Sequence, residues 1–211
     1  MSSHDEQQRW WLYNAMEATR KCHIEAERRL LRNASLTNHA NLYYGCWTAV
    51  LTLLTLDESY AYLAIPSACF ASAVALWAAF ATAEKFEMRA RDFYESYTEL
   101  QQLLGKFEHI EMLQDAEKRQ RELMDLLAEY GRILRSTENH TEGDYASYVC
   151  GQYAGREARG DDANKIPLRI RWLYYWNRYI SYVALRALIY LGIPLILLRS
   201  PDIISCLWHL G

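Results

Sequence analysis

Residues 42–56 read LYYGCWTAVLTLLTL and residues 60–83 read YAYLAIPSACFASAVALWAAFATA, and neither block contains a charged residue. Only Asp57, Glu58 and Ser59 separate the two blocks. As a helix rising about 1.5 Å per residue, the second block spans about 35 Å, enough for a hydrocarbon core of about 30 Å, whereas the first spans about 22 Å. We therefore predict a helical hairpin that crosses a membrane twice, over about residues 42–56 and 61–83, with the acidic turn at its tip.

The residues around the hairpin follow the pattern of membrane interfaces. Tyrosines lie near the ends of both blocks, where such rings anchor a helix at the headgroups: Tyr43, Tyr44, Tyr60 and Tyr62. Basic residues flank the outer ends, namely Arg20, Lys21, Arg28, Arg29 and Arg32 before the hairpin and Lys85, Arg89 and Arg91 after it. Because positive flanks stay in the cytoplasm, both long arms are predicted to be cytoplasmic. The alternative is a helical hairpin buried inside a soluble protein.

The composition of the 211 residues favours an all-α protein, since there are only 9 Gly and 4 Pro and 51% of the residues are hydrophobic. A formal net charge of -3 and a pI near 6.1 argue against direct binding of nucleic acid, which needs a basic surface. The 5 Cys form no C-x-x-C pair, so neither a zinc knuckle nor a disulfide framework is indicated. A reducing cytoplasm suits these cysteines.

Two rows of small residues run along the second span at spacings of four. One row is Ala64, Ala68 and Ser72, and the other is Ala71, Ala75 and Ala79. In lipid, such rows let helix backbones approach closely and drive association. They predict either a homo-oligomer or close packing of the span on its own hairpin partner.

Amphipathic helices are predicted on both sides of the hairpin. Over residues 6–38, a stripe recurs at spacings of four and three: Leu12, Met16, Thr19, His23, Ala26 and Leu30. The run Asn33, Asn38 and Asn41 then marks a bend or a crossing of the headgroup layer. Over residues 84–135, a cytosolic helical arm is predicted to continue straight from the second span. Its first part carries a heptad seam typical of a coiled coil, with Phe86, Ala90, Phe93, Tyr97, Leu100, Leu104 and Phe107 on the packing face. The seam fades at residues 117–121, and the apolar periodicity resumes from Leu123 to Leu134. The partner of this arm is the N-terminal stripe or the same arm of a neighbouring protomer.

The C-terminal third is divided into a connector and an extension. Residues 136–165 are rich in glycine and polar residues and predict a loop-rich connector. A C-terminal helical extension, rich in apolar and basic residues, is predicted over residues 166–211. Over residues 179–198 it either spans the membrane a third time, with Arg186 near the midplane, lies at the membrane interface, or packs on the cytosolic helices.

No enzyme is expected from this sequence. The six histidines form neither a Glu-x-x-His nor a His-x-x-x-His pattern, so the ligands of di-iron and zinc enzymes are missing. There is no G-x-S-x-G elbow, no P-loop and no G-x-G-x-x-G motif. We therefore expect no catalytic residue, no cofactor and no metal site.

Two charged motifs beside the hairpin carry a family resemblance. The first helix contains EAERRL over residues 25–30, and the helix after the hairpin opens with EKFEMRARDF over residues 84–93. Together with the two-span hairpin, these features resemble the SLATT domain, the two-transmembrane effector associated with SMODS nucleotidyltransferases and SLOG domains. The resemblance covers about residues 8–135, within a SLATT-like domain predicted over residues 1–135. The extension is most similar to the SLATT branch found beside reverse transcriptases.

The resemblance implies a pore-forming effector of antiviral defence that acts by abortive infection. In that picture, a sensor encoded nearby, either a nucleotidyltransferase or a reverse transcriptase, detects the phage. The effector then assembles in the bacterial inner membrane and depolarises it, with the small residues of the second span and Arg186 lining the path. The alternative is a non-conducting anchor or adaptor that recruits a partner through its cytosolic helices.

Overall fold

A computed structural model describes residues 3–157, 166–180, 183–184, 186–187 and 190. The elements in this part of the chain are helical, which confirms the all-α class. In order they are α1 (Ser3–Leu54), the 3₁₀ helix η1 (Glu58–Leu63), α2 (Ala64–Ala83), α3 (Phe86–Glu111), α4 (Ala116–Ser136), α5 (Glu142–Glu157), α6 (Leu168–Tyr175) and the π-helical turn η3 (Trp176–Ile180).

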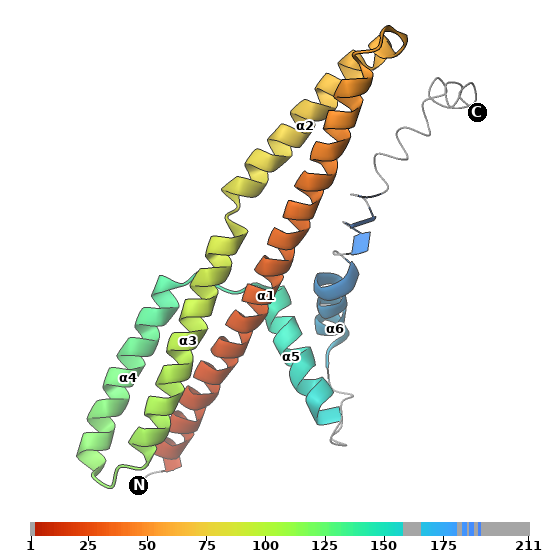
Figure 1. The fold of residues 1–211 in the computed structure, drawn as a ribbon. Coiled ribbons are helices and arrows are strands. Elements are labelled where there is room, and N and C mark those ends of the chain that lie inside the picture. Colours follow the sequence, from red (N-terminus) through yellow and green to blue (C-terminus); the bar gives the residue numbers. More distant parts are fainter. Residues whose placement is uncertain (1–2, 158–165, 181–182, 185, 188–189, 191–211) are drawn as a thin grey trace.

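The helix α1 is uninterrupted from Ser3 to Leu54, so the bend considered for Asn33–Asn41 does not occur. Its apolar end and α2 form the two legs of a hairpin, and α2 runs back along α1 (Figure 1). At the tip, the side chain of Asp57 accepts a hydrogen bond of 2.9 Å from the Ser59 N–H. This cap begins η1 and turns the chain.

Below the hairpin, α1, α3 and α4 lie side by side as a helical stalk (Figure 1). Its core takes Leu12 and Met16 from α1, several leucines of α3, and Leu126, Tyr130 and Ile133 from α4. Met16 and Leu100 are fully buried. Burying one such side chain contributes about 1.5–3 kcal/mol, so the stalk holds together through its apolar stripes.

The second span does not continue straight into the next helix, which corrects that prediction. The helix α2 ends at Ala83, and Lys85 adopts the left-handed conformation with φ 49° and ψ 40°. The N–H groups of Glu84 and Lys85 donate to the carbonyls of Phe80 and Thr82. These bonds close α2 in the manner of a helix C-cap, and a left-handed residue at this position ends the helix.

Residues 84–135 also form two helices rather than one. The chain reverses between Glu111 and Ala116, and α4 folds back on α3. The carboxylate of Asp115 accepts from the N–H groups of Glu117 at 2.9 Å and Lys118 at 3.2 Å. This N-cap starts α4.

The prediction of a loop-rich connector over residues 136–165 is wrong for residues 142–157, because these form α5. A capping box starts the helix: the Thr141 hydroxyl accepts from the Asp144 N–H at 3.3 Å, and the Asp144 carboxylate accepts from the Thr141 N–H at 2.9 Å. The cap and packing against α1 outweigh the glycines. We call residues 137–141, which lead from α4 to α5, the strap.

Candidate functional site

The surface of α2 divides into a covered face and an uncovered face. Ser67 and Ala81 are buried toward α1. On the other side, Ile65, Leu76 and Phe80 are 78%, 73% and 55% exposed. Large apolar side chains exposed along a whole helix are unfavourable in water and mark a surface meant for lipid or protein.

The small residues of α2 lie mostly on the uncovered part of the helix. Ala64, Ala68, Ser72, Ala75 and Ala79 are exposed, whereas Ala71 is half-buried at the edge of the covered face. At about 100° per residue, the five exposed positions fall within about 80° of the helix circumference and form one strip. The Ser72 hydroxyl donates to the Ala68 carbonyl at 2.9 Å, so its polarity is satisfied within α2. Packing on α1 therefore does not use this strip.

The heptad seam of α3 lies against α1. Ala90, Phe93, Leu100, Leu104 and Phe107 are buried there, and Phe86 and Tyr97 are half-buried. The N-terminal stripe meets them, with Leu12, Met16, His23, Ala26 and Leu30 buried and Thr19 half-buried. The two arms predicted to pack thus do so within one chain.

A polar cleft opens where the hairpin meets the stalk. It has a volume of about 370 Å³ and is lined by the end of α2, the start of α3 and the facing turns of α1. Its polar lining residues are Thr37, Asn38, Asn41, Thr82, Lys85 and Glu87. Toward the tip from the cleft, rings lie on both legs of the hairpin. Tyr44 of α1 lies 5.8 Å from Phe70, which is about three turns from Thr82, and within α2 Trp77 lies 6.1 Å from Phe80. The cleft therefore lies at the stalk side of an aromatic layer.

Two buried polar atoms at this level have no hydrogen-bond partner among the residues that the structure describes. They are the side-chain oxygen Oδ1 of Asn41 and the indole nitrogen Nε1 of Trp77. Leaving a buried polar atom unsatisfied costs about 1–3 kcal/mol. Most buried polar atoms in native proteins have a hydrogen-bond partner in the protein or in ordered water, so these two atoms are candidates for contact with a further molecule.

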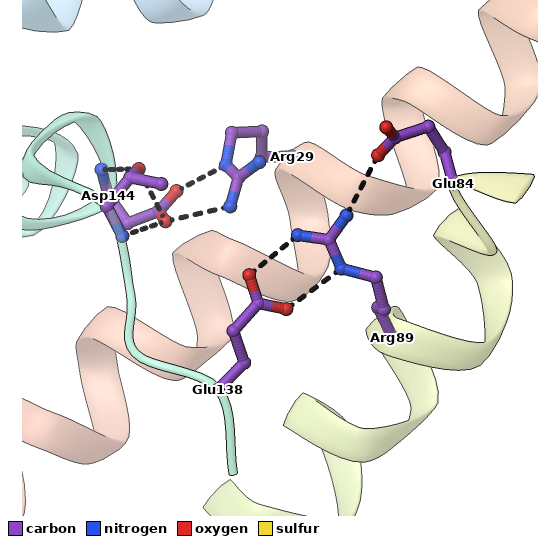
Figure 2. Close-up of polar contacts among 6 residues, drawn as sticks. Arg29, Glu84, Arg89, Glu138 and Asp144 are labelled. Carbon is purple, nitrogen blue, oxygen red and sulfur yellow. Dashed lines mark hydrogen bonds and ion pairs between the residues drawn. The ribbon is translucent and has the colours of Figure 1, made fainter. Parts of the chain in front are cut away.

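Arg89 ties the strap to the break between α2 and α3 (Figure 2). Its guanidinium donates to both carboxylate oxygens of Glu138 at 2.8 and 2.7 Å, and to Glu84 at 3.2 Å. The Glu138 carboxylate beside it raises the pKa of Arg89. Paired, planar contacts of this kind fix orientation as well as charge. One side chain thus links the α4–α5 connection to the last residues of the hairpin.

A second arginine holds the start of α5 against α1 (Figure 2). The Nε and Nη2 atoms of Arg29 donate to the two oxygens of Asp144 at 2.9 and 3.1 Å. Asp144 is fully buried, and its Oδ2 atom also accepts from the N–H and hydroxyl of Thr141 at 2.9 and 2.8 Å. The carboxylate is therefore fully occupied by donors.

His23 lies buried between the strap and α3. Its ring nitrogen Nδ1 lies 2.9 Å from the Ser96 hydroxyl, and its ring packs edge-on against Phe93. Burial lowers the pKa of His23 to about 4, with a smaller contribution from the neighbouring His140 and an opposing one from Asp144. Burial likewise raises the pKa of the Cys22 thiol to about 12. Both side chains are uncharged at neutral pH and act as packing groups.

The chain returns to the hairpin after η3. The Tyr43 hydroxyl donates to the Tyr190 carbonyl at 3.3 Å, and the two rings lie 5.2 Å apart. Arg186 is exposed and precedes Tyr190 by four residues, or about 6 Å along a helix. This contact favours a position for Arg186 near the base of the hairpin rather than at its middle. Most of residues 179–198, including 191–198, lies outside the described residues.

Charge and capping signals in the sequence could have located part of this site. In the sequence, Arg29 and Arg89 indicate only the orientation of the hairpin, and Glu138 and Asp144 belong to no predicted site. The pattern Thr141-Glu-Gly-Asp144 is a capping box and would have predicted the start of α5. Within the described ranges, no three His, Cys, Asp or Glu side chains gather to hold a metal ion.

The sequence pattern of SMODS and SLOG-associating 2TM effector domain family 5 matches residues 5–199. The chain belongs to this SLATT family. The match extends past residue 135, so the SLATT pattern includes α5, α6 and the segment that returns to Tyr43. No curated protein and no solved structure gives a match.

The SLATT assignment makes the chain a two-transmembrane effector domain associated with conflict systems. In the part of the chain that the structure describes, one helical stretch, Ser67–Glu111, contains a segment long and apolar enough to cross a membrane. Only 6% of that apolar segment is buried, which is unlike the core helix of a soluble protein. Together these observations support membrane association.

Proposed function

We propose that this SLATT protein is a membrane effector of a bacterial anti-phage conflict system. Its hairpin inserts into the inner membrane, several copies assemble, and activation by a partner permeabilises or depolarises that membrane. The observation that carries this proposal is the strip of small residues on α2, which α1 leaves uncovered within one chain. It is a surface suited to another helix in lipid.

The geometry of α2 supports self-association. A helix that meets only lipid gains nothing from a strip of five small side chains, whereas a helix that packs on a second copy gains close backbone contact along its length. Large side chains occupy the neighbouring uncovered surface, with Leu76 and Ile65 exposed to the surroundings. In the proposed assembly, small faces meet one another and large side chains face lipid.

The orientation rests on charge. The basic residues that flank the hairpin, among them Arg29 of α1 and Arg89 of α3, lie at its stalk end, whereas the tip carries Asp57 and Glu58. The stalk therefore stays in the cytoplasm together with the N-terminus, and the tip faces outward. A nucleotidyltransferase or a reverse transcriptase encoded beside the gene supplies the activating signal. We propose no enzymatic activity and no direct binding of nucleic acid for the effector itself.

The strap connects the cytosolic helices physically to the end of the hairpin. Arg89 contacts both Glu138 of the strap and Glu84 at the end of the hairpin. A partner that moves α5 or the strap changes these contacts and thereby the constraint on the break at Lys85. The residues that bind the partner lie, in this proposal, on the cytosolic helices.

Conductance in planar bilayers tests the proposal. Purified full-length protein is expected to produce ion currents, and Ala68→Leu is expected to reduce them because it places a large side chain in the small strip. Ala73→Leu is the matched control, since Ala73 is also exposed on α2 but lies about 140° around the helix from Ala68. Silence at every protein density, or equal loss in both variants, would contradict the proposal.

A second candidate is an anchor or adaptor that does not conduct. It is favoured by Trp10 and Trp11 at the far end of the stalk, which are 70% and 61% exposed and suit a protein partner. The test is to replace residues 42–83 with an unrelated membrane hairpin. Intact membrane potential on overexpression, together with retained defence in the hairpin swap, would establish the adaptor and exclude the channel.

The neighbouring genes provide an independent check of the defence role. A reverse transcriptase or nucleotidyltransferase in the same operon is expected, and its deletion should abolish phage-induced depolarisation. Depolarisation that persists unchanged without either gene would remove the partner from the proposal.

A further inference from the structure

The cleft at the hairpin base contains polar groups of both signs that the described residues leave unpaired or only weakly paired. Within the described residues, no carboxylate pairs with the exposed Lys85. Glu87 has one long contact, 3.5 Å from the Asn38 amide. The Asn41 Oδ1 atom is buried and has no donor among the residues that the structure describes. The cleft thus offers one cation, one carboxylate and one unpaired acceptor.

The helix ends around the cleft have opposite polarity. The last turn of α2, with its carbonyl ends, and the first turn of α3, with its N–H ends, both line the cleft. Lys85 provides no side-chain cap for α3. A C-terminus is partially negative and an N-terminus partially positive, so the two ends favour a ligand that carries both charges close together.

The position of the cleft along the hairpin indicates where this ligand resides. The aromatic layer around Tyr44 and Trp77 marks the level at which rings meet lipid headgroups, if the hairpin is inserted as proposed above. The cleft lies on the stalk side of that layer, at the headgroups themselves. Its volume of about 370 Å³ is in the range of sites for small molecules.

We propose that this cleft binds a zwitterionic phospholipid headgroup with a primary ammonium, that of phosphatidylethanolamine. The phosphate lies against Lys85 and the first turn of α3. The ammonium donates to Asn41 Oδ1 and to the Glu87 carboxylate. Thr82 is not needed as a ligand, because its hydroxyl already donates to the Ala78 carbonyl at 2.8 Å. The site rests on the proposed membrane insertion and adds a lipid preference to it.

The preference for phosphatidylethanolamine over other lipids depends on the N–H donors of its ammonium group. Phosphatidylcholine carries the same charges but its ammonium has no N–H, so it cannot satisfy Asn41. Phosphatidylglycerol offers hydroxyl donors but no cation for Glu87. A charge-assisted hydrogen bond to an otherwise unpaired acceptor supplies about a tenfold preference.

Native mass spectrometry of the full chain, released from vesicles of equal parts phosphatidylethanolamine and phosphatidylcholine, tests the site. We expect about tenfold more phosphatidylethanolamine than phosphatidylcholine adducts. Asn41→Leu should abolish this preference and Asn41→Asp should keep it. Asn14→Leu is the matched control, because Asn14 is exposed on the same helix within the stalk.

The charge of Lys85 is tested separately with Lys85→Asn, since Asn tolerates the left-handed conformation while removing the cation. We expect fewer lipid adducts in this variant and wild-type numbers in Lys118→Asn, which removes an exposed lysine of α4. Circular dichroism verifies that each variant is folded. Equal adducts of the two lipids in the wild type, or an unchanged preference in both Asn41→Leu and Lys85→Asn, would overturn the assignment.

Further experiments distinguish the possible sources of the ligand. Soluble phosphoethanolamine added to lipid-depleted protein should give no adduct, because the acyl chains contribute contacts along the hairpin. Adducts as intense as those of the lipid would assign the cleft to a cytosolic ligand instead. A stronger preference for phosphatidylglycerol in matched vesicles would replace the zwitterion with an anionic lipid and refute the role of Glu87.

Flotation with vesicles of pure phosphatidylcholine distinguishes this inference from the proposed function. Protein that floats and resists carbonate extraction but shows no lipid preference refutes only the headgroup site. Protein that carbonate removes refutes insertion, and the headgroup site with it.

Discussion

Replacing Asp144 with Asn should loosen the docking of α5 on α1. The wild-type carboxylate is fully buried and accepts four hydrogen bonds, two from Arg29 and two from Thr141. The side-chain amide of the variant keeps one accepting oxygen, but its NH₂ group is itself a donor and faces the donors of Arg29 or Thr141. Breaking a buried ion pair by removing one partner costs about 3–5 kcal/mol, and since the Arg29 side chain is 16% exposed we expect the lower end, about 3 kcal/mol.

Thermal unfolding of the detergent-solubilised full chain measures this effect by circular dichroism at a fixed scan rate. For a chain of this size, about 3 kcal/mol corresponds to a fall in Tm of about 6–12 °C. The control is Glu95→Gln, which breaks the exposed pair with Arg91 and should change stability by about 0.5 kcal/mol or less. The double variant Arg29→Met with Asp144→Leu should recover much of the loss, because no buried charge remains unpaired.

A Tm for Asp144→Asn within about 2 °C of the wild type would refute this reasoning. It would mean that solvent reaches Arg29 and Asp144, so that α5 does not dock as the structure has it. Failure of the double variant to recover stability, with the single variant as unstable as expected, would instead assign the loss to the Thr141 cap.

Two further perturbations test the hairpin base and the buried histidine. Lys85→Gly should raise Tm by about 2–4 °C, since glycine adopts the left-handed conformation without the steric penalty of about 1 kcal/mol; a lower Tm would show that the Lys85 side chain stabilises the break. Because the pKa of His23 is about 4 in the folded chain and about 6.5 when unfolded, the unfolded chain takes up the proton first as the pH falls. Stability is therefore complete above about pH 6.5 and declines toward pH 4, by about 1–2 kcal/mol between pH 7 and pH 5. His23→Gln should flatten this dependence in unfolding measured at both pH values, and an unchanged slope would assign it to other groups.

Local sequence patterns predicted much of the stalk, because the apolar periodicity of an amphipathic helix involves only residues that are close in sequence. The stripe containing Met16 and the seam containing Phe93 meet each other within one chain. The reversal before Ala116 and the start of α5 were missed although both carry capping residues, Asp115 and Thr141. The glycines of residues 136–165 favour a loop when the sequence is considered alone, whereas in the structure the Thr141 cap and packing against α1 form α5.

The sequence by itself determined the helical class, the position of the hairpin and the family, because each depends on apolar runs and spacings along a single segment. Only the tertiary structure decided which part of α2 remains uncovered and that Arg29 pairs with Asp144, 115 positions away. It also decided that Asn41 lines the same cleft as Lys85, with an Oδ1 atom that has no donor in the described part of the chain. The physical reason is that the identity of a charged or polar residue does not specify which residue it will pair with. The approach of helices distant in sequence selects the pair.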